Sequence, residues 1–308
     1  MPAKRNWERP EIDAPAFVKR VTSFIREQTS NRRAKGVVVG VSGGLDSAVV
    51  SWLLVRALGT DRVKGLFLPE RDTPSQSEHH AREVARGAGF QLETLDLTPS
   101  LESLGIYEDA IGRWTRFKGM NRVALWGLKR FFKTDSYQSI LEGPDHQVLR
   151  DVRAFFRIKH RLRMAILYHQ AEATGCLVAG CLNRTEYRIG FFVPYGDDAG
   201  DLAPLQTLYK RQVRTVAAHL GLPKSVMEKS PSPDLFPGVT DEEILGMTYD
   251  EVDVILFALD QGTSAREIAE RSGIAETRVI RVADWVKASD MMRRPAPVLT
   301  DEEAPDGR

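Results

Sequence analysis

A short run of small residues holds two hydroxyls and one carboxylate and offers the clearest chemistry in this chain. The run GVSGGLDS, residues 40–47, follows three consecutive valines that predict a buried strand. Glycines let the backbone approach a ligand closely, so successive N–H groups converge into a nest for an anion such as pyrophosphate. The run lacks the Lys-Ser/Thr ending of the Walker loop and is not GxGxxG. The candidate ligands of the anion are Gly40, Ser42, Gly43, Gly44 and Ser47.

Phosphate binding alone does not explain why this run contains a carboxylate, that of Asp46. An ionised carboxylate repels phosphate, but the two are compatible when both bind one divalent cation. Mg²⁺ usually takes one or two protein carboxylates together with phosphate oxygens. The run therefore predicts a magnesium-bound polyphosphate beside Asp46. A simpler interpretation stays open here, namely a glycine turn in which Asp46 or Ser42 caps the next helix.

Helical and strand patterns alternate around this run and predict how it is positioned. A helix is expected within residues 16–28, ahead of the first strand. Alternation of strands with crossover helices predicts an α/β fold: a Rossmann-like open parallel sheet with helices on both faces. Such sheets bind ligands outside the carboxyl ends of their strands, where residues 40–47 lie. The expected strands lie within 36–42, 63–69, 90–97, 176–183 and 201–207, and the helices between them within 47–59, 77–89, 160–175 and 209–221.

We expect a single domain over residues 1–308. Two regions of it interrupt the alternation of strands and helices. An insert at about 105–150 contains the basic and aromatic segment 113–133, which has seven Lys/Arg, five aromatics and no Asp/Glu. It could be an amphipathic helix or helical hairpin that covers a partner subunit or the domain's own flank, a nucleic-acid or membrane contact, or a clamp on a phosphate-bearing substrate. The C-terminal part, about 240–297, is expected to be helical; its resemblance to a helix-turn-helix is weak because acids interrupt the bases.

Composition restricts the class of protein further. The net charge is only +1, so nucleic acid is an unlikely main partner. No stretch reaches the roughly 20 apolar residues of a membrane span, and the N-terminus lacks a secretion signal. We therefore expect a cytoplasmic protein without a membrane contact. Cys176 and Cys181 lie in one apolar run and are read as thiols buried in a strand, and no histidine spacing indicates zinc.

Several long motifs resemble one enzyme family. SGGLDS resembles the signature of the ATP pyrophosphatases, which belong to the adenine nucleotide alpha hydrolase superfamily and release AMP and pyrophosphate. Residues 180–213 and 229–256 are similar, in order and spacing, to motifs of NAD synthetase, including GTGN-x-SE and Lys-x-Pro-Ser/Thr-Ala-Asp-Leu. The resemblance runs from about residue 15 to residue 297. It implies ATP- and Mg²⁺-dependent amidation of deamido-NAD to NAD by a C–N ligase that forms a homodimer.

The resemblance also implies roles for individual residues. Asp46 and Glu186 would bind Mg²⁺ and, with Lys210, form the catalytic set. The residues that would contact ATP are Gly40, Ser42, Gly43, Gly44, Asp46, Ser47, Cys181, Lys210 and Ser232. The residues that would contact deamido-NAD are Arg161, Asp201, Arg293 and Arg294.

Four positions depart from the family pattern. Cys181 replaces a threonine, Arg157 and His160 replace small or amide residues, and Pro194 stands where ammonia-dependent members often carry a lysine. These changes leave three alternatives to deamido-NAD amidation. The enzyme could modify another carboxylate or tRNA, or the protein could be a non-catalytic ATP-binding subunit. No glutaminase domain precedes the first helix, so we expect free ammonia or a separate glutaminase as the nitrogen source.

Overall fold

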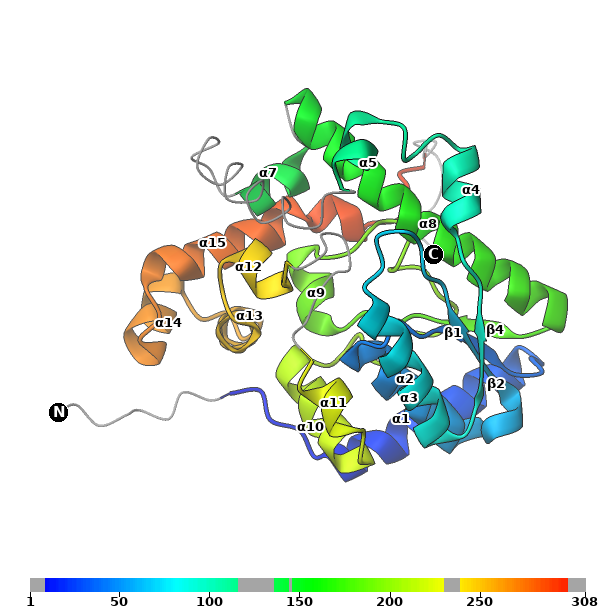
Figure 1. Ribbon diagram of the computed structural model, residues 1–308. Helices are drawn as coiled ribbons and strands as arrows, with labels where there is room; N and C mark the ends of the chain where they lie inside the picture. The colour runs from blue at the N-terminus through cyan, green and yellow to red at the C-terminus, as the bar shows by residue number, and fades with distance from the viewer. Residues whose placement is uncertain (1–8, 116–135, 144–145, 230–238, 299–308) are drawn as a thin grey trace, which may run out of the picture.

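A parallel four-stranded sheet forms the centre of the fold (Figure 1). The computed structural model describes residues 9–115, 136–143, 146–229 and 239–298. The strands follow the order β3-β2-β1-β4. Their bounds are β1 (Val37–Gly40), β2 (Val63–Phe67), β3 (Gln91–Thr94) and β4 (Leu177–Ala179). The order changes direction between β1 and β4, which creates a crevice at the carboxyl ends of these two strands.

Helices cover both faces of the sheet, as predicted. Val37 and Val39 enter one apolar cluster and Val38 enters another, because successive side chains of a strand point to opposite faces. The first face is covered by α1 (Ala14–Asn31), α2 (Leu45–Leu58), α3 (Ser75–Ala88), α10 (Lys210–Leu220) and α11 (Lys224–Met227). The second face is covered by α4 (Thr98–Ser103) and α8 (Gln147–Thr174). This arrangement confirms the predicted Rossmann-like α/β class.

The fifth predicted strand, residues 201–207, is wrong. Only a single parallel bridge joins Ala179 to Leu202. The side chain of Asp201 accepts a hydrogen bond of 2.8 Å from the backbone N–H of Val178, which takes one edge donor of β4 away from strand pairing. Pro204 has no backbone N–H to continue a ladder. The segment therefore continues as turns up to the start of α10.

The C-terminal part is helical, as predicted, and builds a third apolar cluster. Its centre includes Tyr137, Leu245, Ile255 and Trp285, and the Trp285 side chain is fully buried. The elements around it are α7 (Ser136–Glu142), α9 (Arg184–Ile189), α12 (Asp241–Leu245), α13 (Tyr249–Asp260), α14 (Ala265–Ser272) and α15 (Glu276–Ala288). The remaining short helices are η1 (Thr60–Arg62), α5 (Ala110–Trp114) and η2 (Asp290–Arg293).

The insert is described only at its two ends. Its central residues 116–135, which include most of the basic and aromatic segment, lie outside the described residues. On its C-terminal side, α8 begins at Gln147, thirteen residues before the expected start at residue 160. The long helix brings Lys159 and His160 onto the same element as Arg161 and Arg163.

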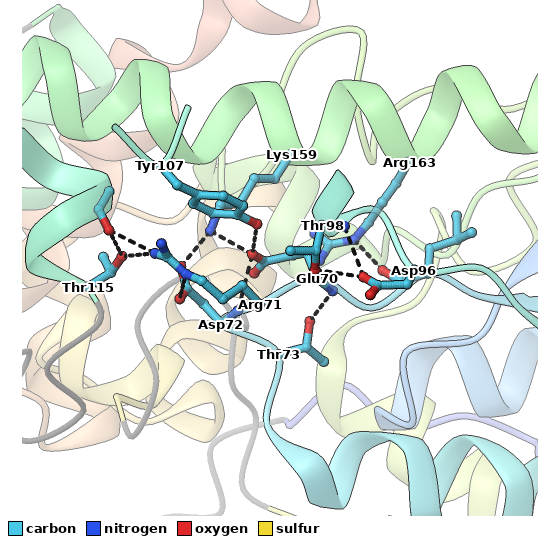
Figure 2. A network of polar contacts seen from close by, with 12 residues as sticks. Glu70, Arg71, Asp72, Thr73, Asp96, Thr98, Tyr107, Thr115, Lys159 and Arg163 are labelled. Atoms are coloured by element: carbon cyan, nitrogen blue, oxygen red, sulfur yellow. Dashed lines mark hydrogen bonds and ion pairs between the residues drawn. The ribbon is translucent and has the colours of Figure 1, made fainter. Parts of the chain in front are cut away.

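A buried network of charges fastens the loop after β2 to α8 and to the start of the insert (Figure 2). Lys159 Nζ donates to Glu70 at 3.1 Å and to Asp72 at 2.9 Å, and all three side chains are at most 5% exposed. The Tyr107 hydroxyl donates to Glu70 at 2.5 Å, and Arg71 lies over the Tyr107 ring. Because buried charges require partners, this network fixes the loop that borders the crevice.

Candidate active site

A cavity of about 780 Å³ opens at the crevice between β1 and β4. Gly40 at the end of β1 and Ala179 at the end of β4 both line it, together with apolar residues of β2 and α8. The predicted site residues on its wall are Gly40, Ser42, Gly44, Asp46, Ser47, Cys181, Glu186 and Lys210. Residues that are 140 positions apart in the sequence therefore share one cavity.

The glycine loop packs too tightly to accept a side chain at Gly43. Gly43 has a φ of +74°, and a Cβ at this position would lie 2.5 Å from the carbonyl oxygen of Ser77. Ser42 Oγ accepts a hydrogen bond of 3.2 Å from the N–H of Gly44, and Ser47 Oγ accepts one of 3.2 Å from the N–H of Ser42. These contacts fix the conformation of the loop where Ser42, Gly44 and Ser47 line the cavity.

The helix-cap interpretation of this run is wrong. Gly44 is the N-cap residue of α2, and no side chain caps this helix end. Asp46 lies in the first turn, and its carboxylate accepts bonds from two residues far away in sequence, Asn183 and Lys210. The uncapped N–H groups at the start of α2 remain available to an anion in the cavity.

Asp46 and Glu186 meet at one ammonium group. Lys210 Nζ donates to Asp46 Oδ2, and it donates to Glu186 Oε1 at 3.1 Å. Asn183 connects the same elements, because its amide donates to Asp46 Oδ1 at 2.9 Å while its oxygen caps α9 by accepting from the N–H of Glu186 at 3.0 Å. Sequence reasoning missed Asn183, although an Asn directly before a helix is a recognised N-cap signal.

Burial and charge set the protonation of this cluster. Burial alone would lower the pKa of Lys210, but the carboxylates of Asp46 and Glu186 outweigh it and raise the pKa well above the usual value. Burial raises the pKa of Glu186 to about 8, and Lys210 opposes this shift while Asp46 and Asp241 add to it. Three acidic side chains therefore act on one ammonium group, and the raised pKa of Glu186 indicates more negative charge than Lys210 alone neutralises.

This charge deficit suits a divalent cation. The oxygen donors of Asp46 and Glu186 are of the type that Mg²⁺ prefers, and they already converge on the position of one cation. Within the described ranges, no set of three His, Cys, Asp or Glu side chains forms a metal site. A Mg²⁺ ion held by Asp46 and Glu186 would take its other ligands from phosphate oxygens and water.

Buried polar contacts hold α9 and α10 in register behind this cluster. The hydroxyl of Thr185 accepts a bond of 2.9 Å from the N–H of Lys210 and donates one of 2.5 Å to Asp253. Asp253 also accepts 2.7 Å from the N–H of Arg211. Because Thr185 precedes Glu186 and Arg211 follows Lys210, Asp253 fixes the relative position of the two site residues. Burial raises the pKa of Asp253 to about 6.

The two cysteines are not buried inside a strand, which corrects the sequence-based interpretation. Both are half-buried, and β4 includes neither of them, because it spans Leu177–Ala179 only. Cys181 lines the cavity, and burial raises the pKa of its thiol above the usual value, with Asp46 and Glu186 adding to the shift. The thiol is therefore protonated at neutral pH.

The residues expected to bind the second substrate do not gather in this cavity. Arg161 donates to the carbonyl of Pro194 at 3.1 Å, next to the lining residue His160. Asp201 forms an ion pair of 3.2 Å with Arg32 and lies outside the cavity lining. Their roles stay predictions.

The predicted basic pair of the tail is engaged in local contacts. Arg293 donates to the carbonyl of Arg188 at 3.0 Å and to that of Val286 at 2.7 Å, and Arg294 pairs with Asp290. Neither arginine lines the cavity. Ser232, the remaining predicted ATP ligand, lies outside the described residues.

Several cations that were not predicted as ligands do line the cavity. They are Arg153, Arg157, Arg163, Arg214 and Lys229. Burial lowers the pKa of Arg157 to about 10, and the charges of Arg153 and Arg161 add to this shift. Cations crowded in this way favour an anionic ligand.

Where the structure describes the chain, none of its helices combines the length and the apolar character that a membrane crossing requires.

The sheet order, the helices on both faces and the cavity at the switch point define a Rossmann-like α/β protein. The sequence profile described as NAD synthase matches residues 17–124 and 132–296, and the chain belongs to this family. An NH(3)-dependent NAD(+) synthetase of Coprothermobacter proteolyticus is 39% identical over 263 residues, which cover 82% of this chain and 87% of the relative. That of Thermotoga maritima is 38% identical over 281 residues, 91% of this chain and 97% of the relative.

Solved structures support the same fold. An NMN synthetase from Francisella tularensis matches with a TM-score of 0.69 at 24% identity, covering 95% of this chain and all of the other. An NH3-dependent NAD synthetase from Campylobacter jejuni, in complex with the nitrate ion, matches with a TM-score of 0.66 at 21% identity, covering 94% of this chain and all of the other. At these identities the likeness concerns the fold alone.

Proposed function

We propose that the protein amidates deamido-NAD to NAD, with ATP as co-substrate and ammonia as nitrogen donor, and releases AMP and pyrophosphate. One observation carries the proposal: in a chain of the NAD synthase family, Asp46 and Glu186 converge on Lys210 beside a glycine loop that is shaped for phosphate. The family membership supports the reaction, and the geometry supports the position of ATP.

The reaction has two steps. First, an oxygen of the nicotinate carboxylate attacks the α-phosphorus of ATP, the bond to the bridging oxygen breaks, and pyrophosphate leaves with the electron pair. Ammonia then attacks the carbonyl carbon of the acyl adenylate, loses a proton, and AMP leaves with one former carboxylate oxygen. Neither step needs a protein nucleophile, so the protein contributes by positioning the reactants and stabilising charge.

Residues of the cavity are suited to these tasks. The N–H groups of the loop and of the start of α2 would bind the departing pyrophosphate, and Lys210 would neutralise part of its charge. Asp46 and Glu186 would hold Mg²⁺, which when bound supplies further positive charge to the phosphate oxygens. Asn183 and Thr185 would keep both carboxylates and Lys210 in register.

The second substrate would enter beside the cations of α8. The assignment of deamido-NAD binding to Arg161, Asp201, Arg293 and Arg294 stays a prediction. A homodimer, a separate glutaminase partner and a cytoplasmic location are also predictions. The cavity cations, Arg157 above all, offer a counter-charge for an acidic nucleotide.

The test is to mix the protein with deamido-NAD, ATP, Mg²⁺ and ammonium and to quantify NAD, AMP and pyrophosphate. Equal amounts of the three products are expected. AMP formed only with another acid, or only with tRNA, would replace the substrate assignment. ATP binding without turnover on any acid would favour the non-catalytic alternative.

A further inference from the structure

Lys229 places a second lysine side chain at the phosphate loop. It follows α11 and lines the same cavity as Lys210. Its Nζ lies 3.4 Å from the hydroxyl of Ser77, a fully buried residue in the first turn of α3. The contact fixes where the ammonium group of Lys229 lies relative to α3.

This part of α3 packs directly on the glycine loop. A Cβ on Gly43 would lie 2.5 Å from the carbonyl oxygen of Ser77 and 2.9 Å from the Cβ of His80. Ser77 therefore contacts the loop through its backbone and Lys229 through its side chain. Lys229 therefore lies on the side of the loop where α3 packs, whereas Lys210 belongs to α10.

The two lysines differ in their charge environment. Lys210 is held by the carboxylates of Asp46 and Glu186. Lys229 forms no ion pair within 4 Å among the residues that the structure describes. After burial, the charge of Lys229 is the largest contribution that lowers the pKa of His80. Because no carboxylate among the described residues pairs with it, the ammonium group of Lys229 is available to an anion in the cavity.

We propose that Lys229 is a catalytic residue that binds the β- and γ-phosphates of ATP and stabilises the pyrophosphate as it leaves. The proposal rests on the proposed function for its choice of ATP. Lys229 transfers no proton in this step: the bond from the α-phosphorus to the bridging oxygen breaks, and the charge that develops on pyrophosphate faces the ammonium group. A donor aimed at developing charge accelerates a reaction by about 10²–10³-fold.

Two measurements on the full chain test Lys229. The first is calorimetric titration with inorganic pyrophosphate in the presence of Mg²⁺, and the second is kcat/KM for ATP with the acid that the wild type amidates. We expect Lys229→Met to weaken pyrophosphate binding at least about tenfold and to lower kcat/KM about 10²-fold. Lys229→Arg should retain most of both, because it keeps the charge. Lys224→Met is the matched control, since Lys224 is an exposed lysine on α11 outside the cavity lining.

The outcomes separate Lys229 from the proposed function. The proposal is overturned if Lys229→Met and the wild type have equal pyrophosphate binding and equal kcat/KM. It is also overturned if Lys224→Met loses as much of both as Lys229→Met does, or if the wild type binds no pyrophosphate. If Lys229→Met does not fold, Lys229→Gln takes its place. A wild type that makes no NAD would overturn the substrate assignment only, because the titration still tests Lys229.

Discussion

The side-chain amide of Asn183 donates a hydrogen bond of 2.9 Å to Asp46, across a separation of 137 residues. The same side chain caps α9, the helix that carries Glu186. One residue therefore sets both the direction of the Asp46 carboxylate and the start of the helix that presents the second carboxylate.

The Asn183→Ala variant should lose more activity than its reduced stability explains. The lost cap costs about 1 kcal/mol of unfolding free energy, and the unrestrained Asp46 should lower kcat/KM by about tenfold or more, since small misplacements are costly in catalysis. Denaturant unfolding and steady-state kinetics measure the two effects. Ser264→Ala, which removes the side-chain cap of α14 away from the cavity, is the control. A control that loses as much activity as Asn183→Ala would contradict the positioning role.

Asp46→Asn and Glu186→Gln should each abolish Mg²⁺-dependent release of pyrophosphate. Each substitution removes one anionic oxygen donor from the expected Mg²⁺ site and one partner from the buried Lys210. We expect kcat to fall by about 10³-fold or more, with the fold retained by circular dichroism. Glu270→Gln, on the exposed surface of α14, is the control and should leave kcat unchanged. Unchanged pyrophosphate release in both site variants would remove the proposed metal site.

Asp253 should give the stability of the protein a pH dependence of a defined sign. Its pKa in the folded protein is about 6 because burial raises it, whereas the ordinary value is 3.8. Between these values the folded state binds more protons than the unfolded state, so the contribution of Asp253 to stability is greatest below pH 4 and falls as pH rises to 6. Relative to Asp253→Asn, the wild type should lose about 2–3 kcal/mol over this range. Urea unfolding of both proteins at each pH measures the difference, and a pH-independent difference would contradict the assignment.

The buried Lys159 network should respond to mutation far more strongly than a surface ion pair. Lys159→Met leaves Glu70 and Asp72 without their shared cation and should cost about 3–5 kcal/mol of unfolding free energy. Arg266→Met, which breaks an exposed ion pair with Glu270 on α14, should leave the unfolding free energy nearly unchanged. Chemical denaturation measures both. Equal small losses would show that the network does not fasten the β2 loop.

Sequence patterns predicted the parallel sheet and its helices, and the family resemblance paired Asp46 with Glu186. The pairing agrees with the fold, because residues that follow parallel strands share one edge of the sheet. They did not reveal the partners of Lys159, since Glu70 and Asp72 lie almost 90 residues away and no local period records such a contact. A buried lysine on a helix also looks like a surface residue in sequence.

The remaining errors have local causes. The segment 201–207 lies where a fifth strand is expected ahead of α10, but Asp201 bonds the edge of β4 and Pro204 removes a donor. Cys181 lies in an apolar run, yet β4 ends at Ala179 and the chain turns into the cavity. Strand ends of this kind depend on tertiary contacts that a window of sequence does not contain.

The path of one oxygen atom tests the central claim most directly. Deamido-NAD labelled with ¹⁸O in its carboxylate is incubated with the protein, ATP, Mg²⁺ and ammonium, and the products are analysed by mass spectrometry. Attack of the carboxylate on the α-phosphorus predicts one ¹⁸O atom in AMP and none in pyrophosphate. Label in inorganic phosphate, with ADP as the nucleotide product, or AMP that contains no label would contradict adenylation of the carboxylate.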